Sequence, residues 1–438
     1  MTEATVSNLR DVYIVDGART PFLKARSKPG PFSASDLAVK AGRQLLERQP
    51  FTPNDLDEVI LGCVMPSADE ANIARVVSLR LGCGKNVPAW TVQRNCASGM
   101  QSIDSAVKDI AMGRSNLVLA GGTEAMSRAP LLYNEGMTEW FAGMASAKDW
   151  KAKLKEIAAF RPSYLKPVIA LLRGLTDPIV NLSMGQTAEI LAYRFNITRE
   201  QMDQFAIESH QRVMAAQEAH HLNEIRTVFT NNGEFFAEDD GVRRDTTMQK
   251  LASLKPFFDK KFGSVTAGNS SQVSDGAALL LLASKEAIQK YRLPVLARII
   301  DTEWAGVDPA EMGLGPVYAT NTLMKRQNLR MHDIDYWEIN EAFAAQVLAC
   351  RAAWESAEYC KQNLGRDNAL GSIDNSRLNV DGGAIALGHP VGASGARITL
   401  HLAEILRREN ARQGIATICI GGGQGGAMLI ENISEVRS

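Results

Sequence analysis

The chain has 438 residues, of which 45% are hydrophobic and 22% are charged, and its 48 basic side chains nearly balance its 49 acidic ones. This size and composition are typical of a folded protein with two or more subdomains. The small net charge argues against nucleic acid as the main partner. No apolar run reaches the length of about 18 residues that a membrane-spanning helix needs.

The amino-terminal residues, MTEATVSNLRDVYIVDG, include acidic side chains and lead directly into a predicted strand. Secretory signals begin with basic residues and an apolar segment, and transit peptides are poor in acidic residues. We therefore expect a cytoplasmic protein.

Residues 11–127 alternate short apolar runs with segments in which apolar side chains recur every three or four positions. The runs predict buried strands, and the segments predict amphipathic helices. The predicted strands cover residues 11–20, 57–65, 89–95 and 116–127, and the predicted helices cover residues 33–48 and 96–113.

From about residue 130 to residue 255 the alternation gives way to charged helical and loop-like sequence, which we interpret as an insertion. The segment 263–284, GSVTAGNSSQVSDGAALLLLAS, then predicts a strand, a turn and a second apolar strand or helix. After Leu293 the opening pattern returns. It predicts a strand at 294–306, a helix at 320–328, a strand entering a helix at 334–354, a loop entering a helix at 378–408 and two strands joined by glycines at 416–432.

The two ends of the chain thus repeat one order of elements, although their sequences differ. Such repeats with buried strands predict an α/β architecture of layered sheets and helices, with a cleft between two halves. We assign residues 1–128 and 256–290 to the first half, residues 129–255 to an inserted domain and residues 291–438 to the second half.

Six cysteines at positions 63, 83, 96, 350, 360 and 419 form no C-x-x-C pair, so the sequence predicts neither a disulfide scaffold nor a zinc site. Cys96 lies within QRNCASGMQS, where a predicted strand enters a predicted helix. A helix amino terminus stabilises negative charge and lowers the pKa of a thiol. The position suits a thiolate nucleophile, and an inert packed thiol is the alternative.

His389 is one of only six histidines and lies in the glycine-rich segment 382–397, GGAIALGHPVGASGAR. Pro390 disfavours helical geometry for the histidine, and the glycines let backbone or ligand approach closely. Near a thiol, an imidazole is the usual activating base. A hydrogen-bonded histidine of the core is the alternative.

Gly421, Gly423 and Gly426 match G-x-G-x-x-G, but a strand pattern follows them instead of the helix of a dinucleotide-binding site. We interpret these glycines as a flat ligand surface or as N–H donors to an oxyanion. The pair Asn340 and Glu341 interrupts an apolar junction. It belongs either to a buried structural network or to a site that holds a water or a carbonyl oxygen.

Five segments, NCASGMQS, GGTEAMS, NEAFAAQ, GGAIALGHPVGASGAR and CIGGGQGGAM, resemble in their order the successive signatures of the thiolases. Thiolases are acyltransferases that cleave 3-ketoacyl-CoA with coenzyme A or run the reverse condensation. The resemblance extends over residues 12–431. It implies a thiolase fold with two similar βαβαβαββ halves in a five-layer α-β-α-β-α arrangement and an inserted loop domain.

The resemblance also implies roles for individual residues. Cys96 would accept the acyl group, His389 would activate it, and Cys419 would move the proton at the α-carbon. Asn340 would hold a water that binds the thioester oxygen together with His389, and the N–H groups of Cys96 and Gly421 would form a second oxyanion hole. Coenzyme A would lie along five residues: Met184, Ala267, Ser271, Ala342 and Phe343. Coenzyme A is a substrate here, and the resemblance implies no metal, flavin or nicotinamide.

Residues 148–173 carry seven basic and two acidic side chains and place Trp150, Leu154, Ile157 and Ala158 on one helical face. This insertion resembles the thiolase subunit of the fatty-acid oxidation complex, which pairs with a hydratase/dehydrogenase subunit. The basic stretch could contact that partner, a membrane surface or the phosphates of coenzyme A, or form a solvated helix face. The resemblance further implies a homodimer or homotetramer.

The sequence favours a 3-ketoacyl-CoA thiolase of fatty-acid degradation, with an acetyl-CoA acetyltransferase as the alternative within the same chemistry. A decarboxylating condensing enzyme would not use a second cysteine such as Cys419. A non-catalytic acyl-CoA carrier of the same fold would not need Cys96, His389 and Cys419 together.

Overall fold

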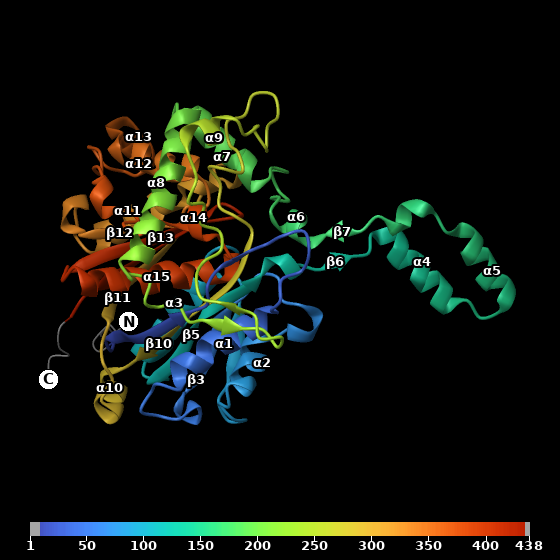
Figure 1. Ribbon diagram of the computed structural model, residues 1–438, viewed down its shortest axis with the longest axis horizontal. Coiled ribbons are helices and arrows are strands. Elements are labelled where there is room, and N and C mark those ends of the chain that lie inside the picture. The colour runs from blue at the N-terminus through green and yellow to red at the C-terminus, as the bar shows by residue number, and fades with distance from the viewer. Residues whose placement is uncertain (1–8, 434–438) are drawn as a thin grey trace, which may run out of the picture.

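The computed structural model describes residues 9–433, which form a layered α/β body with one long projecting arm (Figure 1). Residues 1–8 of the amino-terminal segment and residues 434–438 lie outside the described residues. None of the helices between residues 9 and 433 combines the length and the apolar character needed to cross a bilayer.

The first half follows the predicted order of elements, and it has two further helices, at Ile73–Arg80 and Lys285–Tyr291, that the periodicity does not predict. Its elements are β1 (Val12–Arg19), α1 (Ala34–Leu46), β3 (Glu58–Gly62), α2 (Ile73–Arg80), β4 (Ala89–Val92), α3 (Ser98–Ala111), β5 (Leu117–Ala125), β10 (Ser274–Ala283) and the short α10 (Lys285–Tyr291). A two-residue strand, β2 (Leu23–Lys24), pairs with the start of β10.

The second half repeats this order with one strand reduced. Its elements are β11 (Ala297–Gly306), α11 (Gly315–Arg326), β12 (Tyr336–Ile339), α12 (Ala344–Glu355), α13 (Ala357–Asn363), α14 (Ala384–Leu387), α15 (Val391–Arg408), β13 (Gln413–Ile420) and β14 (Gln424–Glu431). In the first half, β4 pairs with β3. At the equivalent place beside β12 the residues that the structure describes form no strand, and a single isolated bridge joins Leu378 to Trp337 of β12. The loop that follows Leu378 is rich in glycine, and glycine weakens a strand.

The strands form one continuous sheet in the order β12-β13-β14-β11-β1-β10-β5-β3-β4. The two ends of the sheet have the same pattern of pairing. β3 runs parallel to β5, and β12 runs parallel to β13. The next pair in each half, β5 with β10 and β13 with β14, is antiparallel. The halves meet where β1 pairs antiparallel with β11. The repeat expected from the order of elements is therefore present in the pairing of the strands.

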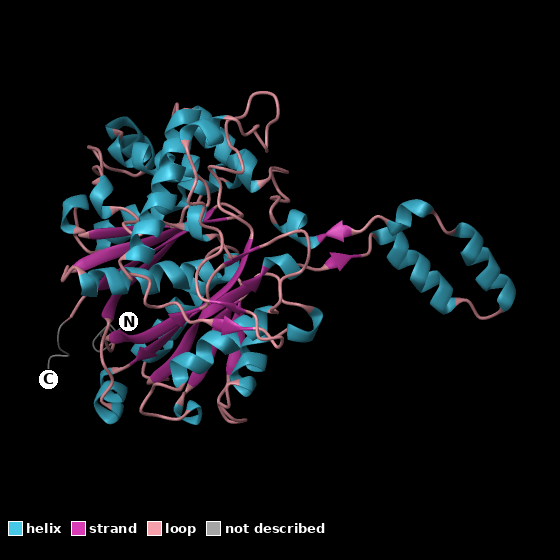
Figure 2. Ribbon diagram, viewed as in Figure 1, coloured by secondary structure: helices cyan, strands magenta, loops and turns pink. Residues whose placement is uncertain are grey.

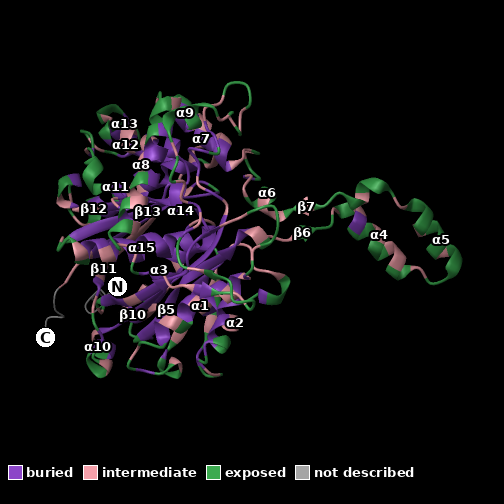
Figure 3. Ribbon diagram, viewed as in Figure 1, coloured by how far each residue is buried: buried purple, intermediate pink, exposed green. Residues whose placement is uncertain are grey.

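Helices α3 and α15 lie between the two halves, α1 and α2 cover the outer face of the first half, and α11 and α12 cover that of the second (Figure 2). The three groups of helices and the two halves of the sheet between them make five layers, which confirms the predicted α-β-α-β-α arrangement. Strands β5 and β10 are buried along their whole length, which is why their apolar runs are continuous rather than alternating (Figure 3).

Glycines let the central layers approach unusually closely. A Cβ on Gly122 of β5 would lie 1.9 Å from the carbonyl oxygen of Gly392, and one on Gly99 of α3 would lie 2.8 Å from the same oxygen. Both distances are shorter than any ordinary contact, so only glycine fits. The amino terminus of α15 is thereby pressed against β5 and α3.

Residues 126–273 connect β5 to β10. They contain β6 (Leu131–Leu132), α4 (Glu135–Ser146), α5 (Trp150–Ala159), β7 (Val168–Ile169), α6 (Ala170–Gly174), α7 (Met184–Arg194), α8 (Arg199–Glu218), β8 (Val228–Phe229), β9 (Phe235–Phe236) and α9 (Met248–Ala252). We call residues 129–175 the arm; its helices α4 and α5 stand away from the body on the β6–β7 pair (Figure 1).

The strand predicted at the start of segment 263–284 is wrong. Residues 263–273 form a loop with one isolated bridge, between Ser270 and Phe343, and the strand β10 begins only at Ser274. Asn269 organises this loop: its Oδ1 accepts the Thr266 N–H at 2.8 Å and its Nδ2 donates to Asp203 at 2.9 Å. Such side-chain bonds compete with a strand ladder.

Candidate active site

Cys96 lies in the tight turn that joins β4 to α3. Asn95 has a left-handed backbone, with φ of 42°, and the Ser98 hydroxyl accepts from the Arg94 N–H at 2.8 Å and donates to the Asn95 carbonyl at 2.7 Å. The Asn95 side chain donates through Nδ2 to the Gly421 carbonyl at 2.7 Å. These bonds fix the turn and tie it to the glycine segment of the second half.

A narrow pocket with a cavity volume of about 40 Å³ opens beside Cys96, and Gly421 also lines it. The other lining residues are mostly apolar and come from both halves and the insertion. They include Met65, Met126, Leu171, Leu175, Met184 and Val391. The pocket therefore suits an apolar group next to the sulfur.

His389 is buried in the short non-helical connection between α14 and α15, as Pro390 predicts. Its Nδ1 lies 2.7 Å from the Ser394 hydroxyl, which also donates to the Pro390 carbonyl at 3.1 Å. Because the hydroxyl proton goes to that carbonyl, the hydroxyl accepts from an Nδ1–H. The Nε2 atom then carries a lone pair, as a base requires, and it faces Nδ2 of Asn340 at 3.4 Å.

Asn340 follows β12 and is fully buried. Its N–H donates to the Thr417 carbonyl at 3.0 Å, and its side-chain Oδ1 has no hydrogen-bond partner among the described residues. A buried acceptor without a partner costs stability, which suggests a ligand or water there. The neighbouring Glu341 differs, because it accepts from Ser209 at 2.7 Å and from Asn379 at 2.8 Å, so it belongs to the structural network.

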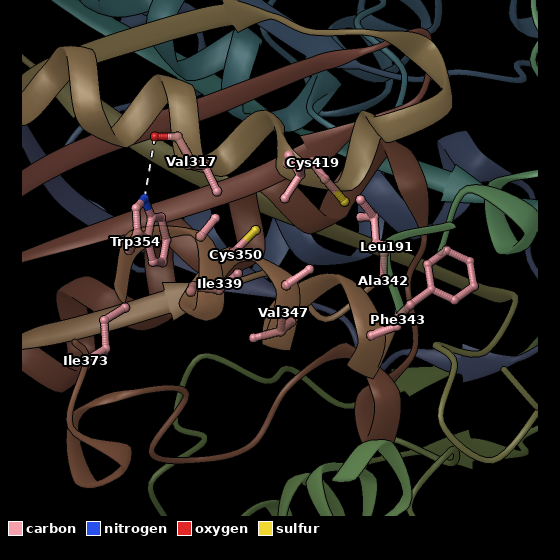
Figure 4. Close-up of a cluster of buried hydrophobic side chains, with 14 of the residues drawn as sticks. Leu191, Val317, Ile339, Ala342, Phe343, Val347, Cys350, Trp354, Ile373 and Cys419 are labelled. Carbon is pink, nitrogen blue, oxygen red and sulfur yellow. Dashed lines mark hydrogen bonds between the residues drawn. The ribbon is translucent and has the colours of Figure 1, made fainter. Parts of the chain in front are cut away.

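Cys419 lies near the end of β13, opposite Gly425 of β14. Burial raises the pKa of its thiol well above the ordinary value, and the neighbouring Cys96 and Cys350 raise it further. Cys96 is thus close enough to Cys419 for a negative charge on its sulfur to oppose ionisation of the Cys419 thiol. Figure 4 shows Cys419 and Cys350 within one apolar cluster.

The predicted groups therefore meet in one region. Cys96 and Gly421 share the pocket, Val391, two residues after His389, lines it, and Asn340 joins His389 to the strand that carries Cys419. Contributions from both halves are needed, as the expected cleft between the halves requires.

The pKa predicted for Cys96 has the wrong direction. Burial raises the pKa of this thiol above its ordinary value, and the N–H groups of Gly421 and of Cys96 itself only partly oppose the rise. Helix α3 begins at Ser98, and its amino terminus favours the thiolate, but the burial of the thiol has the larger effect on its pKa. Burial also lowers the pKa of His389 to about 4, with Arg397 adding to the effect, so the imidazole is neutral at neutral pH.

The residues expected along coenzyme A come from three segments, two of which lie side by side. The Ser271 N–H donates to the Ala342 carbonyl at 3.0 Å, and Phe343 bridges to the residue before Ser271. Ala267 is exposed in the same loop. Met184, at the start of α7, lines the pocket beside Cys96 instead, where its sulfur lies 3.2 Å from a Cβ built on Gly421.

Three of these five residues also pack in the core. Met184, Ala342 and Phe343 are buried in one apolar cluster, and Figure 4 shows Ala342 and Phe343 within it. The Phe343 ring packs edge-on against Phe258, with 5.8 Å between the ring centres. These side chains therefore support the fold in addition to any contact with a ligand.

The glycines after β13 form a turn into β14, so no helix follows them and the dinucleotide reading is excluded. Residues 9–433 contain no cluster of three or more histidine, cysteine or carboxylate side chains that could hold a metal ion.

Residues 12–286 match the thiolase N-terminal domain and residues 293–432 match the thiolase C-terminal domain. The chain belongs to the thiolase family. It is 40% identical over 429 residues to the mitochondrial 3-ketoacyl-CoA thiolase of Mus musculus, covering 97% of this chain and 99% of that protein. It is 34% identical over 425 residues to the mitochondrial trifunctional enzyme subunit beta of Bos taurus, covering 97% and 89%.

Among solved structures, human mitochondrial 3-ketoacyl-CoA thiolase in complex with CoA superimposes with a TM-score of 0.82 at 37% identity, covering 97% of this chain and 98% of that one. These findings confirm the thiolase fold and the acyltransferase activity predicted from the motifs. They also confirm the relation to the thiolase subunit of the fatty-acid oxidation complex.

Sequence reasoning missed one buried residue beside this pocket, Glu124 of β5. Its carboxylate accepts N–H bonds from Val64 at 2.9 Å, Met65 at 3.0 Å and Gly392 at 3.1 Å, and burial raises its pKa to about 7. It thus joins the pocket wall to the amino terminus of α15, three residues after His389. The segment GGTEAMS contained the signal, since a carboxylate inside an otherwise uncharged buried strand needs partners.

Proposed function

We propose that the chain is a 3-ketoacyl-CoA thiolase. It cleaves 3-ketoacyl-CoA with coenzyme A to acetyl-CoA and a shortened acyl-CoA in fatty-acid β-oxidation. The observation that carries the proposal is that Cys96, His389 and Cys419 come from both halves to one site. The 40% identity to a protein named 3-ketoacyl-CoA thiolase supports the substrate class.

In the first step, His389 takes the proton of Cys96, and the sulfur attacks the 3-keto carbon. A base is needed because the raised pKa keeps the free thiol protonated at neutral pH. The neutral ring, with its Nε2 lone pair, is in the form that accepts a proton. The C2–C3 bond then breaks, which leaves an acyl group on Cys96 and the enolate of acetyl-CoA.

The enolate needs hydrogen-bond donors at its oxygen, and one such donor is worth about 3 kcal/mol. We assign this task to His389 and to a water held by Asn340, whose Oδ1 lacks a partner among residues 9–433. The N–H groups of Cys96 and Gly421, which already favour negative charge on the Cys96 sulfur, form the second oxyanion hole.

Cys419 completes the proton balance. Its thiol is protonated at neutral pH, so it gives a proton to C2 of the enolate, and acetyl-CoA leaves. Coenzyme A then attacks the acyl group on Cys96, its thiol proton returns to the Cys419 sulfur, and His389 returns its proton to Cys96. Because the chain's own thiols and imidazole supply every step, we propose that no metal, flavin or nicotinamide is needed, so activity should survive treatment with a chelator.

Coenzyme A itself would lie along Met184 beside the pocket and along the paired segments that hold Ser271 and Phe343. Ala267 is exposed at the start of that loop, and Ala342 accepts the N–H of Ser271. We propose these five residues as the binding surface for the pantetheine arm.

Steady-state thiolysis over a series of chain lengths tests the substrate class. We expect turnover of ketohexadecanoyl-CoA as well as of acetoacetyl-CoA. Activity confined to the four-carbon substrate would instead assign the chain to the acetyl-CoA acetyltransferases.

Alkylation separates the enzyme from a non-catalytic carrier of the same fold. In an enzyme, the base makes the Cys96 thiol reactive, so iodoacetamide should label it. Bound acyl-CoA should slow this labelling, because it fills the pocket beside the sulfur. Labelling that acyl-CoA does not affect, together with no thiolysis, would support the carrier.

For partners, we propose a homodimer or homotetramer, and a hydratase/dehydrogenase subunit in keeping with the trifunctional relative. Sedimentation velocity of the purified chain tests the first part. Peripheral membrane contact through residues 148–173 is proposed as well. Location in the cytoplasm stays a prediction, to be checked by fractionation of the source cells, since the relatives named above are mitochondrial proteins.

A further inference from the structure

Helix α15 carries a polar stripe that is buried over most of its length, and the proposed mechanism uses only one end of it. The stripe consists of Ser394, Arg397, His401 and Arg408, whose spacing of three, four and seven residues places them on one side of the helix. Ser394 holds the His389 ring, and each of the other three pairs with a carboxylate from outside the helix. The stripe therefore connects α15 to neighbouring segments, starting at the catalytic imidazole.

The second member of the stripe forms an ion pair with β12. Arg397 donates through Nη1 to Oε2 of Glu338 at 2.8 Å, and the two side chains are 2% and 0% exposed. Glu338 precedes Asn340 by two positions, and the strand ladder continues through the Asn340 N–H, which bonds to Thr417. Side chains two positions apart in an extended chain lie on one side of it. Glu338 and Asn340 therefore both face α15.

Helix α15 and strand β12 are thus joined at two points. At the first, Nδ2 of Asn340 and Nε2 of His389 lie 3.4 Å apart, which is long for a hydrogen bond. This contact cannot hold the two groups firmly, because the proposed mechanism requires both of them at the enolate oxygen. At the second point, the bond between Glu338 and Arg397 is short, charged and buried. The second point therefore determines how far apart the first pair lies.

Stability alone is a poor reason for this ion pair. Oε1 of Glu338 has no hydrogen-bond partner among residues 9–433, so the buried carboxylate is only half satisfied. Burial raises the pKa of Glu338, and the charge of Arg397 only partly opposes the rise. Apolar side chains of similar size are often as stable as a buried ion pair. The pair therefore fits a role in the site better than a role in stability.

We propose that Glu338 and Arg397 are positioning residues of the thiolase reaction, whose ion pair fixes the distance between Asn340 and His389. The assignment rests on the proposed function, in which these two groups stabilise the enolate oxygen together. Neither Glu338 nor Arg397 lines the pocket beside Cys96, so neither is placed to contact the acyl group. The charge of Arg397 has a second effect on the site, since it helps to keep the His389 imidazole neutral.

A double variant tests the positioning role. Glu338→Leu/Arg397→Met exchanges the ion pair for apolar side chains of similar size, and its thermal midpoint should stay near that of the parent chain. In thiolysis of acetoacetyl-CoA, kcat should fall by about tenfold or more, because small displacements of catalytic groups have effects of this size. KM for coenzyme A should stay within about twofold. Assays at pH 8 keep Glu338 ionised in the parent chain, since burial raises its pKa to about 7.

Two partial reactions show which step is affected. Exchange of the C2 hydrogens of acetyl-CoA with deuterium oxide requires the enolate and should fall by the same factor as kcat. Alkylation of Cys96 by iodoacetamide requires only the thiol and its base, so its rate should stay within about twofold. A pair that merely supported the fold would change both reactions alike, or neither.

Single variants keep the test decisive where the double variant does not fold. Arg397→Lys retains the charge and should keep more of the parent kcat than Arg397→Met does, with the same order in deuterium exchange. Arg408→Met is the matched control. Arg408 lies in the same stripe, about 16 Å further along the helix axis at 1.5 Å per residue, and pairs with Asp381. The control should leave kcat within about twofold.

Parental kcat and exchange in the folded double variant would overturn the proposal, as would an equal loss in Arg408→Met. If the double variant is unfolded, equal kcat in Arg397→Lys and Arg397→Met overturns it. Loss of kcat together with an equal loss of Cys96 alkylation would assign the pair a structural role instead. A parent chain with neither thiolysis nor exchange contradicts the proposed function and the positioning role with it, whereas an active parent with an equally active double variant contradicts the positioning role alone.

Discussion

The centre of the molecule and the arm are built in opposite ways. At the centre, glycines bring β5, α3 and α15 within a distance that leaves no space for one methyl group. In the arm, two helices are held by a tryptophan, a few aromatic contacts and one asparagine, and most apolar side chains face solvent. The difference indicates that the chemistry depends on the packing of the two halves, whereas the arm presents a surface.

Replacing the nucleophile should have the largest effect. Cys96→Ala should lower kcat/KM for thiolysis by about 10⁴-fold or more, because acyl transfer then has no acceptor. The thermal midpoint should change little, since the side chain lies at the pocket.

Cys360→Ala, a buried cysteine of α13 bonded only to helix carbonyls, is the control and should keep activity within about twofold. Equal losses in the two variants would show that the cysteine effect is structural.

The same substitution at the centre and in the arm sharpens the comparison of the two regions. Leu280→Ala in β10 removes a fully buried side chain and should lower the free energy of unfolding by about 2 to 5 kcal/mol. Leu154→Ala in α5 removes an exposed one and should change it by less than about 0.5 kcal/mol. Urea denaturation measures both, and similar losses would mean that the arm packs against something in solution.

Glu124→Gln should have a smaller effect on activity, visible in the pH profile. The carboxylate accepts three N–H bonds, and one of its two oxygens becomes a donor in the amide, so we expect kcat/KM to fall by about tenfold above pH 7. Since burial raises the pKa of Glu124 to about 7, the parent enzyme should lose activity as the pH falls through 7 and the carboxylate is protonated.

The Glu124→Gln variant should lack this loss of activity as the pH falls through 7. If the variant kept it, the titration would belong elsewhere, for example to Glu338, the other buried carboxyl whose pKa burial raises to about 7.

Much of the architecture could be predicted because periodicity and glycine position are local signals. The strand before Cys96, the helix after it and the turn between β13 and β14 all follow from residues within a few positions. The apolar face of α5 follows from spacing in the same way, whereas its exposure does not.

The misses all depend on tertiary contacts. The pKa of Cys96 rises because the thiol is buried in a pocket lined by residues of both halves, which no stretch of ten residues reveals. Residues 263–273 form a loop because Asn269 bonds to Asp203 of α8, 66 positions away. Glu124 holds Gly392 across the interface of the halves, and only the folded chain brings these residues together.

The most direct test of the central claim is to locate the acyl group. The chain is incubated with 3-ketohexadecanoyl-CoA without added coenzyme A, quenched in acid and digested, and the peptides are analysed by mass spectrometry. The account predicts a tetradecanoyl group on the peptide that contains Cys96, removed when coenzyme A is added before the quench. An acyl group on Cys419 or another cysteine, or turnover with no acylated peptide, would contradict it.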